Sequence, residues 1–234
     1  MKQMMTLLMA AGQDSGPKGQ ARVRVVHASP DAPPVDILVN GTIRAFRNVT
    51  FGDVTNYASL PAGVYDFAIV PTGGGLSSAV QVIPAVNLSY YGNYTVVALN
   101  TLANFEVIPL VDTNRTTDAL LYPGAARLRF LHASPDAPAV DLKVAGGPFL
   151  YKNVAFKQVG DYLLVPAGKA DVEVRLAGTD TVVLTVPGVQ LKPGNTYTAY
   201  ATGFALGGQP RLSVVLSKDT GPSNENRFSR GQND

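Results

Sequence analysis

The chain has 234 residues, of which 46% are hydrophobic and 15% are charged, and its formal net charge is +2. This balance is typical of a folded globular protein and excludes a disordered chain, while so small a net charge argues against nucleic acid as a partner. Cysteine is absent, which excludes disulfides, thiolate metal sites and a cysteine nucleophile.

The N-terminal residues are typical of an export signal followed by a flexible leader. Met1–Gly12 combines one lysine, a short apolar run and small residues, as a clipped signal peptide does. We therefore expect residues 1–20 to be a leader and the protein to be exported, to the periplasm, cell envelope or cell surface. No stretch is long enough to predict a transmembrane segment. Thioethers can bind Cu(I), but we interpret the methionines of this region as apolar filler of the signal: Met1, Met4, Met5 and Met9.

From residue 22 onward the dominant pattern is alternation with a period of two. In the first run, Val23, Val25 and His27 share one face. Arg22 and Arg24 take the opposite face. Short strands separated by Gly, Pro and Asn turns predict an antiparallel β-sandwich, and no helical periodicity of useful length occurs. Further strand-like runs lie at residues 35–40, 64–70, 79–83, 94–99 and 105–110.

The whole series returns 105 residues further along the chain. Ten residues, His27–Asp36, recur as His132–Asp141, and the two segments differ only in Pro34 against Ala139. A period this long indicates a duplicated domain rather than a solenoid unit. We therefore predict an all-β protein made of two tandem Ig-like antiparallel β-sandwich domains. The predicted boundaries are a leader at 1–20, a first sandwich at 21–111, a linker at 112–124, a second sandwich at 125–216 and a disordered tail at 217–234.

The repeated ten residues contain both histidines of the chain and a strong turn signature. In Ser-Pro-Asp-Ala-Pro, proline fixes φ, and aspartate accepts hydrogen bonds from the backbone of its own turn. The prolines also keep this segment out of a sheet ladder, which predicts a rigid corner between two strands. We favour a structural role in which His27 with Asp31, and likewise His132 with Asp136, brace the corner through hydrogen bonds.

A metal site is the alternative interpretation of the same motif. Histidine with nearby carboxylates can bind a divalent metal and leave an open position for catalysis. Strand alternation argues against the full set, because Asp36 and Asp141 lie on the face opposite the apolar stripe. Serine lies too close to histidine on this turn to align as a nucleophile, so we assign no catalytic or cofactor-binding residue. The candidate ligands are His27, Asp31 and Asp36 in the first copy and His132, Asp136 and Asp141 in the second.

The element His-Ala-Ser-Pro-Asp-Ala-Pro-x-Val-Asp, together with the turns Leu60–Gly63 and Val165–Gly168, resembles DUF4397, a family of uncharacterised bacterial domains. The resemblance covers both copies, over residues 21–216. It implies an exported or surface-associated protein with β-sandwich domains in tandem. It transfers no catalytic residues, because the family carries no established activity.

We therefore expect a non-enzymatic structural or binding protein of the cell envelope or surface layer, with other envelope or surface-layer proteins as partners and no cofactor. The alternative is a metal-dependent redox enzyme of the envelope, such as a copper superoxide dismutase that uses the repeated His/Asp motif. A β-sandwich can carry such a site, but two histidines are fewer than these sites normally use. Metal analysis of the purified protein distinguishes the two functions.

Overall fold

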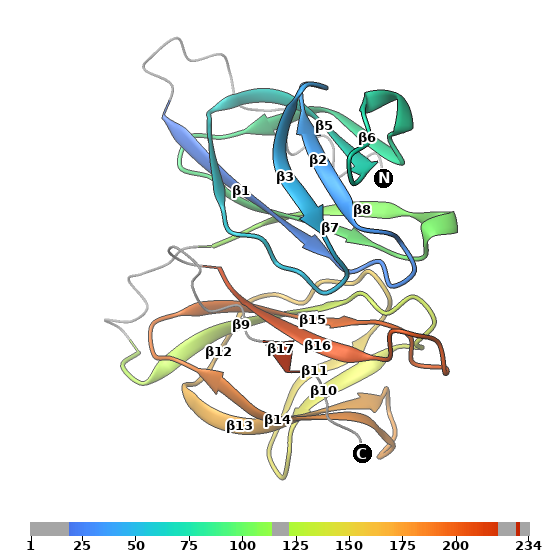
Figure 1. The fold of residues 1–234 in the computed structure, drawn as a ribbon. Coiled ribbons are helices and arrows are strands. Elements are labelled where there is room, and N and C mark those ends of the chain that lie inside the picture. Colours follow the sequence, from blue (N-terminus) through green and yellow to red (C-terminus); the bar gives the residue numbers. More distant parts are fainter. Residues whose placement is uncertain (1–18, 114–121, 220–227, 230–234) are drawn as a thin grey trace. The chain divides into compact units, whose positions relative to one another are not determined.

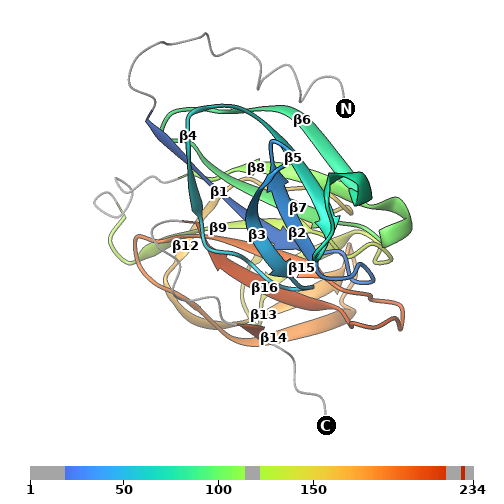
Figure 2. The same ribbon diagram turned by 45° about the horizontal axis from the view of Figure 1, so that its top comes forward.

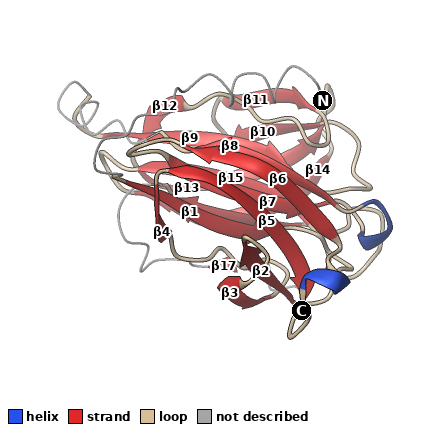
Figure 3. Ribbon diagram, turned by 90° about the horizontal axis from the view of Figure 1, so that it is seen from above, coloured by secondary structure: helices blue, strands red, loops and turns tan. Residues whose placement is uncertain are grey.

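The computed structural model describes residues 19–113, 122–219 and 228–229 (Figure 1). These residues form an all-β protein with two short 3-10 helices and no α-helix among them (Figure 3). The strands divide into two compact units, one built around the strands between residues 20 and 111 and the other around those between residues 125 and 229. The predicted fold class, two sandwiches in tandem, is confirmed. In the described part of the chain, no helix is long and apolar enough to cross a membrane.

The first unit is a sandwich of two four-stranded sheets. One sheet contains the long hairpin of β5 (Gly63–Pro71) and β6 (Gln81–Leu88), which Figure 2 shows. One sheet has the order β4-β1-β7-β8 and consists of β1 (Gln20–His27), β4 (Ala58–Pro61), β7 (Asn93–Leu99) and β8 (Glu106–Val111). The other has the order β3-β2-β5-β6 and consists of β2 (Val35–Val39), β3 (Ile43–Val49), β5 (Gly63–Pro71) and β6 (Gln81–Leu88). The 3-10 helices are η1 (Leu76–Ser78) and η2 (Leu102–Asn104).

The second unit repeats this arrangement and adds one short strand. Its first sheet has the order β12-β9-β15-β16-β17 and consists of β9 (Ala125–His132), β12 (Leu163–Pro166), β15 (Thr196–Thr202), β16 (Ser213–Lys218) and β17 (Phe228–Ser229). Its second sheet has the order β11-β10-β13-β14 and consists of β10 (Val140–Val144), β11 (Phe149–Val154), β13 (Gly168–Leu176) and β14 (Val182–Leu191).

Corresponding strands preserve the register of the sequence repeat. β1 and β9 begin 105 residues apart, and β5 and β13 keep the same separation. The separation becomes 103 residues at β7 and β15, because the loop after β13 is shorter than the loop after β5. It becomes 107 at β8 and β16, because the loop after β15 is longer. Both changes fall in loops, where insertions and deletions are tolerated.

The alternation read from the sequence builds the core of each unit. Val23 and Val25 of β1 pack against Val35 and Ile37 of β2 in the first unit. The equivalent core of the second unit includes Phe130. Burying one apolar face of each sheet against the other is the main stabilising contribution to such a sandwich.

Each unit contains a parallel strand pair. β1 pairs with β7 in parallel, with Arg22 opposite Asn93, and β9 pairs with β15 in the same way. The pairs β1–β4, β2–β5 and β5–β6 are antiparallel, as the sequence predicts. Period-two alternation reports which face a residue takes and carries no information on strand direction.

The ends of the predicted segments are only partly described. β16 extends to Lys218, two residues into the segment that the sequence analysis assigned to the tail, and Asp219 is buried. β17 pairs with β16 at Val214 and Val215. The predicted signal peptide with its methionines, most of the linker and the rest of the tail lie outside the described residues.

Candidate functional site: the repeated corner

The two histidines brace their corners as predicted. His27 is fully buried at the end of β1, and its Nε2 lies 3.2 Å from the carbonyl oxygen of Pro33. His132 is equally buried, and its Nε2 lies 3.0 Å from the oxygen of Pro138. Because a carbonyl oxygen only accepts, Nε2 carries the proton in both rings. In the second corner, Nδ1 also accepts from the amide of Ser134 over 3.3 Å.

Burial keeps both rings neutral. Desolvation lowers the pKa of His27 below its usual 6.5, although the Pro33 carbonyl and the charge of Asp53 oppose the shift. Desolvation likewise lowers the pKa of His132, against the opposing effect of the Pro138 carbonyl. A neutral imidazole that donates from Nε2 is the form the corner requires at neutral pH.

Asp31 and Asp136 bind a different segment from the one that the sequence predicted. We expected each to accept hydrogen bonds from the backbone of its own turn, but Asp31 reaches the loop before β8 and Asp136 reaches the loop before β16. Asp31 Oδ1 accepts from the amide of Leu102 over 2.7 Å. Asp136 accepts from the amides of Ala205 and Leu206 over 2.7 and 2.9 Å. The carboxylate therefore ties the corner to a loop about 70 residues further along the chain.

Asp36 lies on the predicted face of β2, opposite Val35 and Ile37, yet this face is also buried there. Its carboxylate accepts from the amides of Asn48 and Gly73 over 2.6 and 3.0 Å, and it pairs with Arg44. Burial alone would raise its pKa, but these amides and the guanidinium outweigh burial and leave the pKa of Asp36 below its usual value. Asp36 is therefore a charged anchor for two backbone segments.

Asp141 repeats this anchor on β10, where no arginine of the described residues lies at hydrogen-bond distance from it. It is buried and accepts from the amides of Asn153 and Gly178 over 2.6 and 3.1 Å. The φ angles of Asn48 and Asn153 are +49° and +51°, in the left-handed region that asparagine tolerates. The second Asp of the motif thus fixes the same irregular backbone position in each repeat.

The structure does not gather the candidate ligands into one metal site. Each histidine donates to a proline carbonyl, and each aspartate holds backbone amides of another segment. Across residues 19–113 and 122–219, no group of three or more His, Asp or Glu side chains could hold a metal ion. The two corners also differ in how their buried polar atoms are satisfied. His27 Nδ1 and Ser29 Oγ are buried with no hydrogen-bond partner among the described residues, whereas His132 Nδ1 accepts from the amide of Ser134 and Ser134 Oγ donates to Gly203 O over 2.6 Å.

The comparison with known proteins assigns the family. The sequence matches the family described as a domain of unknown function, DUF4397, at residues 21–143 and again at residues 126–230. The chain belongs to the DUF4397 family. The two matches agree with a tandem pair of DUF4397 repeats, as the sequence motif implied. No curated protein matches the sequence significantly.

Two solved structures show faint similarity to the DUF4397 chain. The Bacillus anthracis TIE protein is 7% identical over 83% of this chain and 34% of its own length, with a TM-score of 0.25. A structure described as alpha-glucan binding by a streptococcal virulence factor is 9% identical over 77% of this chain and 92% of its own, also with a TM-score of 0.25. The chain thus spans about a third of the TIE protein.

Each DUF4397 repeat contains a second polar cluster that alternation alone did not predict. Arg24 lies on the face opposite the core, as expected, but it is fully buried. Its Nε donates to Thr95 Oγ1 over 2.7 Å, and its guanidinium lies 4.6 Å from the ring centre of Tyr57. Asp112, the residue after β8, accepts from the Tyr57 hydroxyl over 2.6 Å and from Thr95 over 2.5 Å.

The second repeat builds the same cluster. Arg129 Nε donates to Thr198 Oγ1 over 3.0 Å, and the guanidinium lies 4.4 Å from the ring centre of Tyr162. Asp219, the residue after β16, accepts from Thr198 and from the Tyr162 hydroxyl, each over 2.7 Å. The sequence does contain a sign of this cluster: Arg24 and Tyr57 recur 105 residues later as Arg129 and Tyr162, at the same period as the motif.

Proposed function

We propose that this DUF4397 protein is a non-enzymatic structural or binding protein of the cell envelope or surface layer, with other envelope proteins as partners. One observation carries the proposal: the side chains best suited to chemistry hold backbone in both repeats. His27 and His132 bind proline carbonyls, and Asp36 and Asp141 bind backbone amides. Because the polar side chains of the motif stabilise the backbone in both repeats, the motif supports a structural role rather than a reaction centre.

Family membership adds to this support, because the resemblance implies exported, surface-associated proteins. The proposal therefore predicts that the protein is found with the envelope in fractionated cells, and that purified envelopes bind it in a sedimentation assay. Recovery of the protein only in the cytosolic fraction would refute the envelope role.

The copper superoxide dismutase alternative is tested on the purified full chain. We expect no stoichiometric copper, zinc or iron by elemental analysis, and added Cu²⁺ should raise the melting temperature little, because a metal that binds only the folded state stabilises it by mass action. The matched variant is the double substitution His27→Ala, His132→Ala. The proposal would be overturned if the wild type dismutated superoxide and the double variant, while still folded, did not.

A further inference from the structure

A β-bulge in the second unit brings an aromatic side chain to the outer face of its second sheet. Leu142 of β10 pairs with Tyr151 of β11, whereas the next residue, Lys143, pairs with Phe149. Leu150 is therefore the extra residue of a bulge, and both Leu150 and Tyr151 pack against the core. Phe149 is left on the outer face of the sheet, beside Lys143.

Two lysines converge on this ring, which is 38% exposed. The Nζ of Lys152 lies 4.4 Å from the ring centre of Phe149, and the Nζ of Lys143 lies 5.1 Å from it. The partial negative charge of the ring faces attracts both ammonium groups. Because both approach one ring, the two charges lie within about 10 Å of each other, a separation over which salt does not fully screen their repulsion. We call Lys143, Phe149 and Lys152 the Phe149 cluster.

The first repeat has the same bulge, but its outer face carries different chemistry. There Leu38 pairs with Arg44, at the positions that correspond to Lys143 and Phe149. Leu38 is buried, and Arg44 forms an ion pair with Asp36. The shared backbone therefore does not require an exposed ring with two lysines. The Phe149 cluster is a feature of the second repeat and not of the common fold, so its explanation must lie in what the side chains do.

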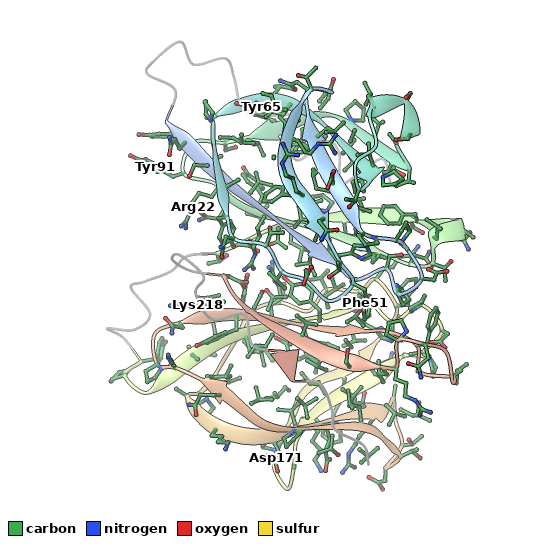
Figure 4. All side chains as sticks on the ribbon, in the orientation of Figure 1. Arg22, Phe51, Tyr65, Tyr91, Asp171 and Lys218 are labelled. Carbon is green, nitrogen blue, oxygen red and sulfur yellow. The ribbon has the colours of Figure 1, made fainter. Side chains whose placement is uncertain are left out.

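Carboxylates on the neighbouring strand β13 bind other groups and leave the lysines uncompensated. Glu173 is the residue opposite Lys143 in the sheet, but its carboxylate lies 2.7 Å from a guanidinium nitrogen of Arg175. Asp171, labelled in Figure 4, accepts from the amide of Gly188 over 2.7 Å. Among the described residues, neither lysine of the Phe149 cluster forms an ion pair with a carboxylate. The cluster therefore carries two positive charges that the protein itself does not neutralise there.

The chemistry of the cluster selects the class of ligand. Ammonium groups donate hydrogen bonds and accept none, and the edge of a phenyl ring carries partial positive charge. The cluster therefore attracts a negatively charged group whose oxygens only accept. Lysine binds phosphate as a point charge, whereas the planar fork of arginine is better matched to a carboxylate. The arginine of this face, Arg175, is already paired with Glu173, so a phosphate group is the better match.

We propose that the Phe149 cluster binds the phosphodiester groups of an anionic polymer of the envelope, with Lys143 and Lys152 supplying the positive charge. A polymer suits one small exposed site, because its neighbouring phosphates keep the effective concentration at the site high after one of them dissociates. The small net charge of the chain, +2, argues against a nucleic acid as the source of the phosphodiesters. The inference deepens the proposed envelope role and rests on it for the source of the polymer.

The test measures binding of hexa(glycerol phosphate) to the full chain by NMR at low ionic strength. The wild type should bind with a dissociation constant on the order of 1 mM, and added salt should weaken binding because the site is exposed. The chemical shift changes should centre on Lys143, Phe149 and Lys152. The double variant Lys143→Gln, Lys152→Gln should lose at least about tenfold in affinity. Phe149→Leu removes the ring that holds the two ammonium groups together and should also weaken binding.

The matched control is Lys169→Gln, Lys192→Gln, which removes the same charge from two other exposed lysines of the second unit and should leave the affinity unchanged. Hexaglutamate, an acidic peptide, should bind more weakly than the phosphodiester. No binding of hexa(glycerol phosphate) by the wild type, an equal loss in both double variants, or binding of hexaglutamate that is at least as tight would overturn the proposal.

Sedimentation with purified envelopes separates this inference from the proposed function. Binding of hexa(glycerol phosphate) without envelope association would refute the envelope role and leave the binding site in place. Envelope association that is undiminished in the folded Lys143→Gln, Lys152→Gln variant would refute the role of the Phe149 cluster and leave the proposed function in place.

Discussion

The buried carboxylate of Asp219 offers the sharpest test of what stabilises a repeat. Its side chain is fully buried, accepts two hydroxyl hydrogen bonds of 2.7 Å and lies 3.9 Å from a guanidinium nitrogen of Arg129. Removing one charge from a buried ion pair costs about 3–5 kcal/mol, so Asp219→Asn should destabilise the second unit by that amount. Tyr162→Phe removes one hydrogen bond to a charged group and should cost about 1.5–3 kcal/mol.

The measurement is urea denaturation followed by far-UV circular dichroism. Since denaturant slopes are about 1–3 kcal/mol per M of urea, the midpoint of Asp219→Asn should fall by at least about 1 M. The matched control is Asp180→Asn, because Asp180 pairs with Arg175 at a shorter distance, 3.0 Å, but is completely exposed. Solvent screens such a pair, so this control should leave the midpoint unchanged. Equal effects of the two substitutions would refute the reasoning that burial, and not the distance between the charges, decides how much an ion pair contributes to stability.

Three further outcomes follow from named contacts. Burial lowers the pKa of His27 and His132 below 6.5, so their contribution to stability is complete above that pH and is lost as the pH falls. The melting temperature of the wild type should therefore decrease as the pH falls below about 6.5, and this decrease should be smaller in a double variant in which both histidines are replaced by glutamine. Gly203→Ala places a Cβ 2.3 Å from a backbone oxygen and should lower the melting temperature more than Gly146→Ala, whose Cβ would enter open space. Gly146→Ala should cost only the energy of holding alanine in the left-handed conformation, about 1–2 kcal/mol. Equal melting temperatures of the two variants would contradict this expectation. Asp141→Ala removes two hydrogen bonds from backbone amides and should cost about 1–3 kcal/mol in urea denaturation, with an unchanged midpoint counting against the anchor.

Alternation and repetition in the sequence were enough to predict the fold class. Val23 and Val25 lie in the core, and the 105-residue period predicted two units of equal architecture. The same reasoning placed His27 at a corner and predicted that its bonds stay within that corner, as found. These features depend on residues close together in sequence, where face and turn chemistry follow from residue type.

Long-range partners could not be predicted in the same way. Asp31 was expected to serve its own turn, yet its partner Leu102 is 71 residues away. Arg24 was correctly placed on the outer face, but polarity gave no sign that this face is buried. Alternation shows which face of the sheet a side chain lies on but not how deeply that side chain is buried. The sequence of one strand does not reveal which other segment of the chain covers that face. Pairing between distant strands is decided by the whole topology.

The parallel pairing of β1 with β7 also dictates the order in which a repeat can fold. Arg22 meets Asn93 only after 71 further residues have been made, so the first strand cannot complete its sheet early in synthesis. Contacts this distant in sequence slow folding, because the intervening loop must close before they form. Until then the apolar face of β1 has no complete sheet around it. The nascent chain of each repeat therefore passes through a stage that is exposed to aggregation, and that stage ends when its seventh strand arrives.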